Sequence, residues 1–144
     1  MKTALSVLFL CCTTARLGAL CATTSLDQYF AGSRAVFVGR AIAREPSSRD
    51  DRHTVTTFEV EEMWKGSPDM TIRIETCGAD RRDLGLVFSC EDSITFRLGS
   101  RYLVFAIGEP LQTDTCRPTG LIEGSRRSQD ALRWLADKPR IASR

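Results

Sequence analysis

A single histidine, His53, and the absence of any C-x-x-C pair limit the chemistry available to this chain. Zinc sites draw on several histidines or on closely spaced cysteines, so we expect no zinc site, and the same spacing argues against a redox-active thiol pair. His53 stands in a polar stretch with no nucleophile patterned beside it, so it is predicted to be a surface residue and not the base of an exported hydrolase. The sequence therefore predicts no catalytic residue, no metal ligand and no cofactor.

The chain also lacks an excess of charge. The net charge is +2, but Lys2 and Arg16 belong to the leader described next, and without them 18 basic residues balance 18 acidic ones. A neutral domain exerts no long-range attraction on nucleic acid or on an anionic membrane. Only 8% of the residues are aromatic, which leaves few rings to stack on bases or sugars. No nucleic-acid partner is expected.

No hydrophobic run reaches the roughly 20 residues of a membrane span. The N-terminus has one positive charge, a short apolar core, and small or polar residues up to Ala19. This arrangement predicts a signal peptide over 1–19, with cleavage after Ala22 as the alternative. The mature domain then covers 20–144, and the protein is predicted to be secreted or periplasmic.

Lipid attachment at Cys21 would require a small residue before that cysteine, and Leu20 stands there instead. We therefore expect contact with a membrane only if Cys21 is lipidated despite this neighbour. At the other end of the chain Pro139 stops the last helical pattern. The tail over 139–144 is expected to fray.

Four cysteines remain once the leader, which carries Cys11 and Cys12, is removed. An even number in an exported domain of this size implies two disulfides. Three pairings are possible, and the sequence alone does not separate them. The four residues are Cys21, Cys77, Cys90 and Cys116.

Five stretches have the alternation or the short apolar runs that predict β-strands. The most apolar of them runs into a Gly/Pro turn and a further strand that ends near Cys116. Gly39 inside the first stretch predicts a bulge or bend. In the third stretch Met70, Ile72 and Ile74 are expected to point inward. The five predicted strands cover 35–44, 55–64, 70–77, 102–107 and 111–115.

The segments between these strands are predicted to be loops. Residues 45–52 are polar and broken by a proline, 78–89 hold a charged turn followed by a short apolar patch, and 117–120 form a turn. In the second strand Glu59 and Glu61 share one face. Alternate glutamates of this kind are typical of the solvent side of a strand, so we do not interpret them as paired catalytic carboxylates.

Two helices are predicted to flank the strands. Ser25 suits an N-cap before 26–31, and an apolar stripe at helical spacing runs through 125–136, where Trp134 and Leu135 are expected to pack on the sheet. Five strands in hairpin-like order with a helix at each end fit a small, closed or partly open Greek-key barrel of the OB type. Periodicity alone does not distinguish such a barrel from a sandwich.

The order and spacing of several motifs resemble the netrin-like domain, and more closely the bacterial relatives of the tissue inhibitors of metalloproteinases. The resemblance covers about residues 21–137, and it implies an OB-like five-stranded barrel. The motifs are Cys21, Leu26 to Phe30, Ala35-Val36-Phe37-Val38-Gly39-Arg40, Phe58-Glu59-Val60-Glu61-Glu62-Met63-Trp64-Lys65-Gly66, Gly99-x-x-Tyr102-Leu103-Val104-Phe105-Ala106 and Leu111-x-Thr113-x-x-Cys116.

The resemblance also implies a disulfide pairing. Cys21 resembles the second of two N-terminal cysteines in the family, whose partner corresponds to Cys116. Cys90 resembles the partner of the first, which leaves Cys90 to bond Cys77. The implied disulfides are Cys21–Cys116 and Cys77–Cys90, with Cys21–Cys90 plus Cys77–Cys116 as the alternative.

In the animal inhibitors the first cysteine chelates the zinc of the protease through its amine and carbonyl oxygen, and Ala19 takes its place here. The resemblance thus implies a non-enzymatic binding module, with at most a weak or divergent metalloprotease-inhibitor role and a protein partner such as an extracytoplasmic metalloprotease. The alternative is a small exported OB-fold ligand-binding protein unrelated to protease inhibition. The residues expected to contact the partner are Leu20, Cys21, Ala22, Thr23 and Thr24.

Overall fold

The computed structural model describes residues 21, 23–81, 86–88 and 90–142, so the predicted signal peptide lies outside the described residues. The described chain is mainly β with two helices, as predicted. Its elements are α1 (Leu26–Gly32), β1 (Ala35–Pro46), β2 (His53–Lys65), β3 (Thr71–Cys77), β4 (Ala79–Arg81), β5 (Leu86–Phe88), β6 (Arg101–Ala106), β7 (Gly120–Leu121) and α2 (Arg126–Leu135).

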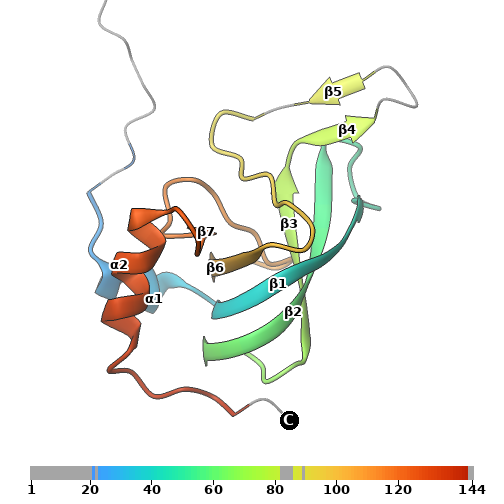
Figure 1. The fold of residues 1–144 in the computed structure, drawn as a ribbon. Coiled ribbons are helices and arrows are strands. Elements are labelled where there is room, and N and C mark those ends of the chain that lie inside the picture. The colour runs from blue at the N-terminus through green and yellow to red at the C-terminus, as the bar shows by residue number, and fades with distance from the viewer. Residues whose placement is uncertain (1–20, 22, 82–85, 89, 143–144) are drawn as a thin grey trace, which may run out of the picture.

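One sheet organises the molecule. Its five antiparallel strands follow the order β3-β2-β1-β6-β7, while β4 and β5 form a separate two-stranded hairpin. The long strand β1 is central, because it pairs with β2 on one side and with β6 on the other. Figure 1 shows both helices beside one flank of the sheet and the β4–β5 hairpin at the end where β3 finishes.

The apolar run predicted as a buried strand is β6, in which every residue from Tyr102 to Ala106 is buried. Successive strand residues point to opposite faces. Accordingly Tyr102 and Val104 pack into one core cluster, and Leu103 and Phe105 pack into another. The apolar run in the sequence is continuous because each face of β6 packs into one of the two core clusters.

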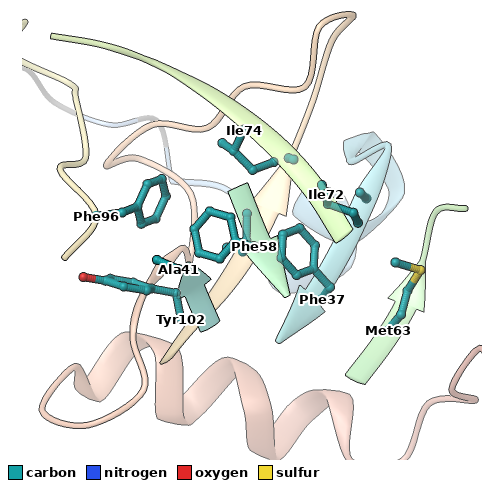
Figure 2. Close-up of a cluster of buried hydrophobic side chains, with 11 residues drawn as sticks. Phe37, Ala41, Phe58, Met63, Ile72, Ile74, Phe96 and Tyr102 are labelled. Carbon is teal, nitrogen blue, oxygen red and sulfur yellow. The ribbon is translucent and has the colours of Figure 1, made fainter. Parts of the chain in front are cut away.

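The first core cluster packs aromatic rings together on one side of the sheet (Figure 2). Phe58 packs edge-to-face against Phe96 with ring centroids 4.8 Å apart, and Phe96 packs in the same way against Tyr102 at 4.9 Å. The Tyr102 hydroxyl accepts the backbone N–H of Arg97 at 2.8 Å, so its polar end is satisfied. Edge-to-face packing stabilises aromatic pairs by more than the burial of their surface area alone.

Gly39 lets β1 bend around this cluster. The register of β1 against β2 shifts between Val38 and Gly39, which confirms the predicted bulge. A Cβ at Gly39 would lie 2.7 Å from the carbonyl oxygen of Glu59, so no larger residue fits without a backbone shift. The bulge therefore depends on glycine at this position.

The second core cluster joins the opposite side of the sheet to the helices. Ala131 and Leu135 of α2 are fully buried with Trp64 of β2 beside them. Phe30 of α1 meets Trp134 of α2 edge-to-face at 5.7 Å. The predicted packing of α2 through Trp134 and Leu135 is confirmed.

The predicted strand over 111–115 is wrong. Only Gln112 makes bridges there, antiparallel to Ile107 and parallel to Glu75. The extended conformation stops because the Thr113 hydroxyl is buried and donates to the Phe105 carbonyl at 2.9 Å, and a turn begins at Asp114. A side-chain hydroxyl thus replaces the backbone donor that a strand would supply.

The fifth strand lies instead in β7, where a loop over 117–120 was expected. Gly120 pairs with Leu103, and Leu121 pairs with Tyr102. The short segment occupies the edge of β6 beside α2, where a Cβ at Gly120 would come within 2.7 Å of Ser128 Oγ. Its two residues are too few to leave a periodic signal.

Two further expectations for the third strand and its neighbour are corrected. Ile72 and Ile74 are buried as predicted, but Met70 is 66% exposed, because β3 starts only at Thr71. The segment 78–89, expected to be a loop, contains the paired strands β4 and β5. The tip of this hairpin, 82–85, lies outside the described residues.

The sheet is not closed by its strands, so the OB-like barrel stays a prediction. β3 meets the segment after β6 through the parallel bridge of Glu75 with Gln112, in which the N–H of Glu75 donates to the carbonyl of Leu111 at 2.8 Å. In the tail predicted to fray, the N–H of Ile141 donates to the Met63 carbonyl at 2.7 Å. Residues 143–144 lie outside the described residues.

Candidate partner-binding site

The residues predicted to contact a partner precede α1. Cys21 and Thr23 are exposed and Thr24 is half-buried. Leu20 and Ala22 lie outside the described residues. Where this segment enters α1, Ser25 forms a capping box with Gln28, in which the Gln28 N–H donates to Ser25 Oγ at 3.2 Å and the Ser25 N–H donates to Gln28 Oε1 at 3.0 Å. The entry into the helix is therefore set by reciprocal hydrogen bonds.

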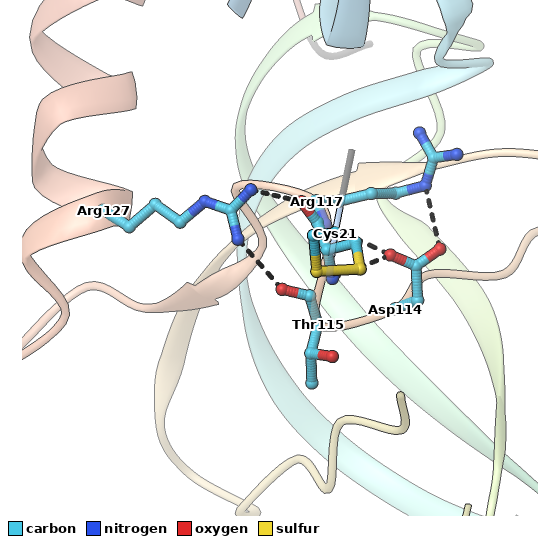
Figure 3. The surroundings of a disulfide bond; sticks show 6 residues. Cys21, Asp114, Thr115, Arg117 and Arg127 are labelled. Atoms are coloured by element: carbon cyan, nitrogen blue, oxygen red, sulfur yellow. Dashed lines mark hydrogen bonds and ion pairs between the residues drawn. A yellow bond between two sulfur atoms is a disulfide. The ribbon is translucent and has the colours of Figure 1, made fainter. Parts of the chain in front are cut away.

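A disulfide joins Cys21 to Cys116, with the Cα atoms 5.2 Å apart, and confirms the pairing implied by the resemblance. The bond attaches the start of the described chain to the turn that follows Thr113 (Figure 3). The two cysteines are 95 residues apart in sequence. The segment before α1 is thereby held against a part of the chain close to the sheet.

Two charged side chains hold the turn that carries Cys116 (Figure 3). Asp114 Oδ1 accepts the backbone N–H groups of Cys116 at 3.0 Å and Arg117 at 3.1 Å, while its Oδ2 lies 3.4 Å from Arg117 Nε. From α2, Arg127 donates to the carbonyl of Thr115 at 2.9 Å and also to that of Cys116. No pattern in the sequence marked this support, because α2 and the turn meet only in the folded chain.

The second disulfide, Cys77–Cys90, is also the one implied by the resemblance. It joins the end of β3 to a turn in which the N–H of Ser93 donates to the Cys90 carbonyl at 3.1 Å. The N–H of Thr115 donates to the Asp92 carbonyl at 3.0 Å, so this turn is bonded to the one that carries Cys116. The two disulfides therefore belong to one connected edge of the molecule.

A pocket of about 190 Å³ opens on the same edge. Both cysteines of the second disulfide line it, together with Ile107 and several polar or ionisable residues. They include His53, Glu75, Asp92 and Asp114. The wall of the pocket thus reaches from the second disulfide to the residue that holds the turn of the first.

Glu75 is the unexpected member of this set, since only 5% of the residue is exposed. Ser47 Oγ donates to Oε1 at 2.5 Å, Gln112 Nε2 donates to Oε2 at 3.2 Å, and Arg49 Nη1 lies 3.6 Å from Oε2. Burial acts to raise the pKa of Glu75, but the hydrogen bonds from Ser47 and Gln112, with the nearby charges, outweigh burial and hold the pKa below its ordinary value. Glu75 is therefore an ionised, buried carboxylate at neutral pH.

The sequence did not indicate this role for Glu75. By strand alternation from Ile74 it should face solvent, but it is buried, and Gln112 pairs with it along the edge of β3. Its partners Ser47 and Gln112 are 28 and 37 residues away. No local pattern connects residues at such separations.

His53 is half-buried, with Nδ1 3.4 Å from Asp50 Oδ2. Within the described part of the chain no group of three or more His, Cys, Asp or Glu side chains is arranged to hold a metal ion. Glu59 and Glu61 are exposed, and Glu61 Oε2 accepts from Arg101 Nε at 2.7 Å. This ion pair raises the pKa of Arg101.

The two disulfides indicate an oxidising, extracytoplasmic environment. In the ranges that the structure describes, neither helix has the length and apolar character needed to cross a membrane.

No protein-family model matches the chain. No curated protein matches it either.

Proposed function

We propose that this protein is an extracytoplasmic, non-enzymatic binding module of the netrin-like type, with a divergent form of the protease-binding edge found in tissue inhibitors of metalloproteinases. The observation that carries the proposal is the Cys21–Cys116 disulfide, because it attaches the segment before α1 to the folded domain. A binding segment held in place before it meets a partner loses less entropy on binding.

The proposal includes an OB-like barrel. Support comes from the bridges of Gln112, which link β3 at one edge of the sheet to Ile107 beyond β6. A partly open barrel needs a link of this kind between the ends of its sheet. The aromatic rings of Phe58, Phe96 and Tyr102 form a buried cluster on one side of the sheet, as the core of such a barrel would require.

The partner-binding surface would consist of Cys21, Thr23 and Thr24 together with the turn over 114–117. Its rigidity comes from Asp114 and Arg127, which satisfy the polar groups of that turn. The family mechanism needs a cysteine amine at the zinc, but the equivalent position is Ala19, which is removed with the predicted signal peptide. The expected mode is therefore contact along the edge of the protease site without zinc chelation.

The test is binding of the full, natively processed protein to the catalytic domain of a secreted zinc metalloprotease, measured by surface plasmon resonance. We expect binding to weaken when a hydroxamate inhibitor fills the protease site. Thr23→Arg should weaken binding by about tenfold or more, because it places a large charged side chain in the contact. Ser67→Arg, on an exposed turn elsewhere, is the matched control and should bind as the native protein does.

Mass spectrometry of the native protein without reduction completes this test. A chain that begins at Leu20, with both disulfides intact, fits the divergent mode. A chain that begins at Cys21 with a free amine would instead favour zinc chelation, and an added lipid mass would place the module at a membrane. Equal binding of the Thr23→Arg and native proteins would refute the proposed surface.

The pocket lined by Glu75 favours a second candidate, a ligand-binding protein with the same barrel and no role in protease inhibition. Binding of small ligands without any binding to proteases would favour this candidate.

A further inference from the structure

The strand β2 extends beyond the strand that covers its outer edge. The pairing of β2 with β3 ends at Glu59 and Thr71 and is followed by a backbone bond from the N–H of Val60 to the carbonyl of Met70 at 2.9 Å. Residues 61–65 of β2 therefore have no strand of the described sheet on the side opposite β1. An edge of this kind offers backbone donors and acceptors to an extended segment that lies alongside it.

The C-terminal tail of the chain lies along this edge as a strand would. Ile141 forms an antiparallel bridge with Met63, in which its N–H donates to the Met63 carbonyl at 2.7 Å. The Ile141 side chain packs against the first core cluster, whereas the guanidinium of Arg140 lies over the ring of Trp64, 5.7 Å from its centroid, in the second core cluster. Successive strand residues point to opposite faces in this way. The tail thus contacts the edge through its backbone and through a side chain on each face.

Glu62 adds a charged contact to this arrangement. Its Oε2 lies 3.1 Å from Arg140 Nη2, and the side chains of Arg140 and Glu62 are 59% and 36% exposed. An exposed ion pair of this kind contributes little to stability. Among the described residues, Ile141 makes the one backbone bond between the tail and this stretch. The tail is therefore held weakly enough for another segment to replace it.

Trp64 points independently to a ligand at this edge. The residue is only 6% exposed, and its Nε1 has no hydrogen-bond partner among the described residues. Buried donors normally have an acceptor, and an unpaired one costs stability. This is the ring that Arg140 covers, so the described tail leaves a donor unsatisfied beneath it. A longer extended segment carries further backbone carbonyls that can accept from this donor.

We propose that residues 61–65 of β2 form a strand-addition site for an extended segment of a protein partner in which a basic residue precedes a β-branched apolar one. The tail over 139–142 occupies the site until such a segment replaces it. In strand addition, main-chain bonds supply affinity and alternate side chains supply specificity. Arg140 and Ile141 show which side chains the edge accepts. The inference does not depend on the proposed protease contact, which uses the segment before α1 and the turn over 114–117.

The probe is an acetylated and amidated peptide with the sequence of residues 137–142, titrated into the full oxidised protein and followed by NMR. It should shift the amide signals of residues 61–65 and the indole N–H signal of Trp64, one of two tryptophans in the chain. A Kd of about 1 mM is a reasonable value for so short a segment. The same peptide with an N-methyl group at the position of Ile141 should bind at least about tenfold more weakly, because it lacks the N–H that pairs with Met63.

Release of the chain's own tail should strengthen peptide binding. Ile141→Pro removes the same N–H from the full-length protein, in which a short linker holds the tail at an effective concentration on the order of millimolar. A ligand that must displace an internal competitor binds with an affinity reduced by the fraction of free sites, so this variant should bind the peptide about two- to fivefold more tightly than the native protein. Ala142→Pro retains the Ile141 N–H and is the matched control, with the Kd of the native protein. Equal binding by the native protein and Ile141→Pro would overturn the proposal.

The charged contact has its own pair of variants. Glu62→Gln should weaken peptide binding by about two- to threefold. Glu59→Gln, exposed in the part of β2 that pairs with β3, should leave the Kd unchanged. If Ile141→Pro does not keep the native amide spectrum, Arg140→Ala takes its place, with an expected tightening of about twofold. Equal binding of the native and N-methyl peptides, or shifts confined to another surface, would contradict the inference.

The tail of a second copy is the competing occupant of this edge, since identical elements can be exchanged between protomers. Sedimentation velocity at the protein concentration used for NMR distinguishes the two cases. A dimer that Ile141→Pro abolishes would assign the edge to tail exchange and reject a partner segment. A monomer that binds the peptide, with the ranking of variants given above, would support the partner segment.

Discussion

Ser47 and Glu75, which are 28 residues apart, meet in a buried hydrogen bond of 2.5 Å from Ser47 Oγ to Oε1. This contact joins the loop between β1 and β2 to β3. Through Gln112, which donates to the other oxygen at 3.2 Å, it also reaches the segment after β6. Three parts of the chain thus converge on one carboxylate, and the first two predictions concern that junction.

Ser47→Ala should lower the free energy of unfolding by about 1–3 kcal/mol, because it leaves a buried charged acceptor short of one donor. Urea denaturation followed by circular dichroism measures this loss. Ser67→Ala, in an exposed turn, is the control and should change stability by less than about 0.5 kcal/mol. Equal effects of the two variants would show that the Ser47–Glu75 bond contributes nothing.

The contribution of Glu75 should depend on pH. Its pKa is below the ordinary value in the folded protein, despite burial, because of the bonds from Ser47 and Gln112 and the charges of His53 and Arg49. The stabilisation is therefore fully present above the unfolded pKa of about 4.3 and is lost as the pH falls through the folded pKa. The stability difference between the native protein and Glu75→Gln should shrink as the pH is lowered below about 4.

The matched control for this pH series is Glu109→Gln, since the Glu109 side chain is 78% exposed. Its stability difference from the native protein should stay small at every pH. A Glu75→Gln difference that grows toward acid pH would mean that the folded-state pKa is raised, contrary to our assignment.

Gly39→Ala should destabilise the fold by about 1–3 kcal/mol, the usual cost of overpacking. The new Cβ would stand 2.7 Å from the backbone oxygen of Glu59, where no flexible side chain can yield. Gly32→Ala is the comparison, because nothing lies within 4 Å of a Cβ there and the residue belongs to α1. In thermal unfolding, the native protein and Gly32→Ala should have similar midpoint temperatures, and Gly39→Ala should have a clearly lower one.

The two disulfides should contribute unequally to stability. In the chain-entropy model, loss of the Cys21–Cys116 bond, with its separation of 95 residues, costs about 4–5 kcal/mol. Loss of the Cys77–Cys90 bond, with a separation of 13, costs about 3 kcal/mol. Paired Cys→Ser variants compared by guanidinium denaturation measure both values, and the reverse order would contradict the entropic account.

Truncation of Phe58 to Ala should cost about 3–5 kcal/mol, because its ring is fully buried between aromatic neighbours. Met70→Ala removes a side chain that the sequence placed inside but that is 66% exposed. Its cost should be under about 0.5 kcal/mol. Comparison of the two variants therefore tests whether Met70 lies on the surface, as in the structure, or in the core, as the sequence predicted.

Local patterns predicted much of this fold. Strand alternation located β1 and β2 and the inward pair Ile72 and Ile74, helical spacing located α1 and α2, and an apolar run located β6. These features depend on residues within one element, so they are visible in the sequence. The single-residue bridges of Gln112 and the two residues of β7 depend on distant partners, and no local pattern marked them.

The disulfides, too, could be predicted only in part from the residues themselves. Counting cysteines predicted two bonds but left three pairings open, because a count contains no distances. The resemblance selected Cys21–Cys116 and Cys77–Cys90, and the structure has both. The protein partner and the inhibitor-like role remain proposals for the experiments above.

The sequence by itself determined the mainly β class, the two helices, and a cysteine count suited to an oxidising environment, because each depends on composition or on short-range periodicity. Only the tertiary structure decided that Glu75 is buried beside a pocket and that Asp114 and Arg127 hold the turn of Cys116. The physical reason is that burial and pairing of charges are set by which segments meet in space, and those segments are separated here by tens of residues.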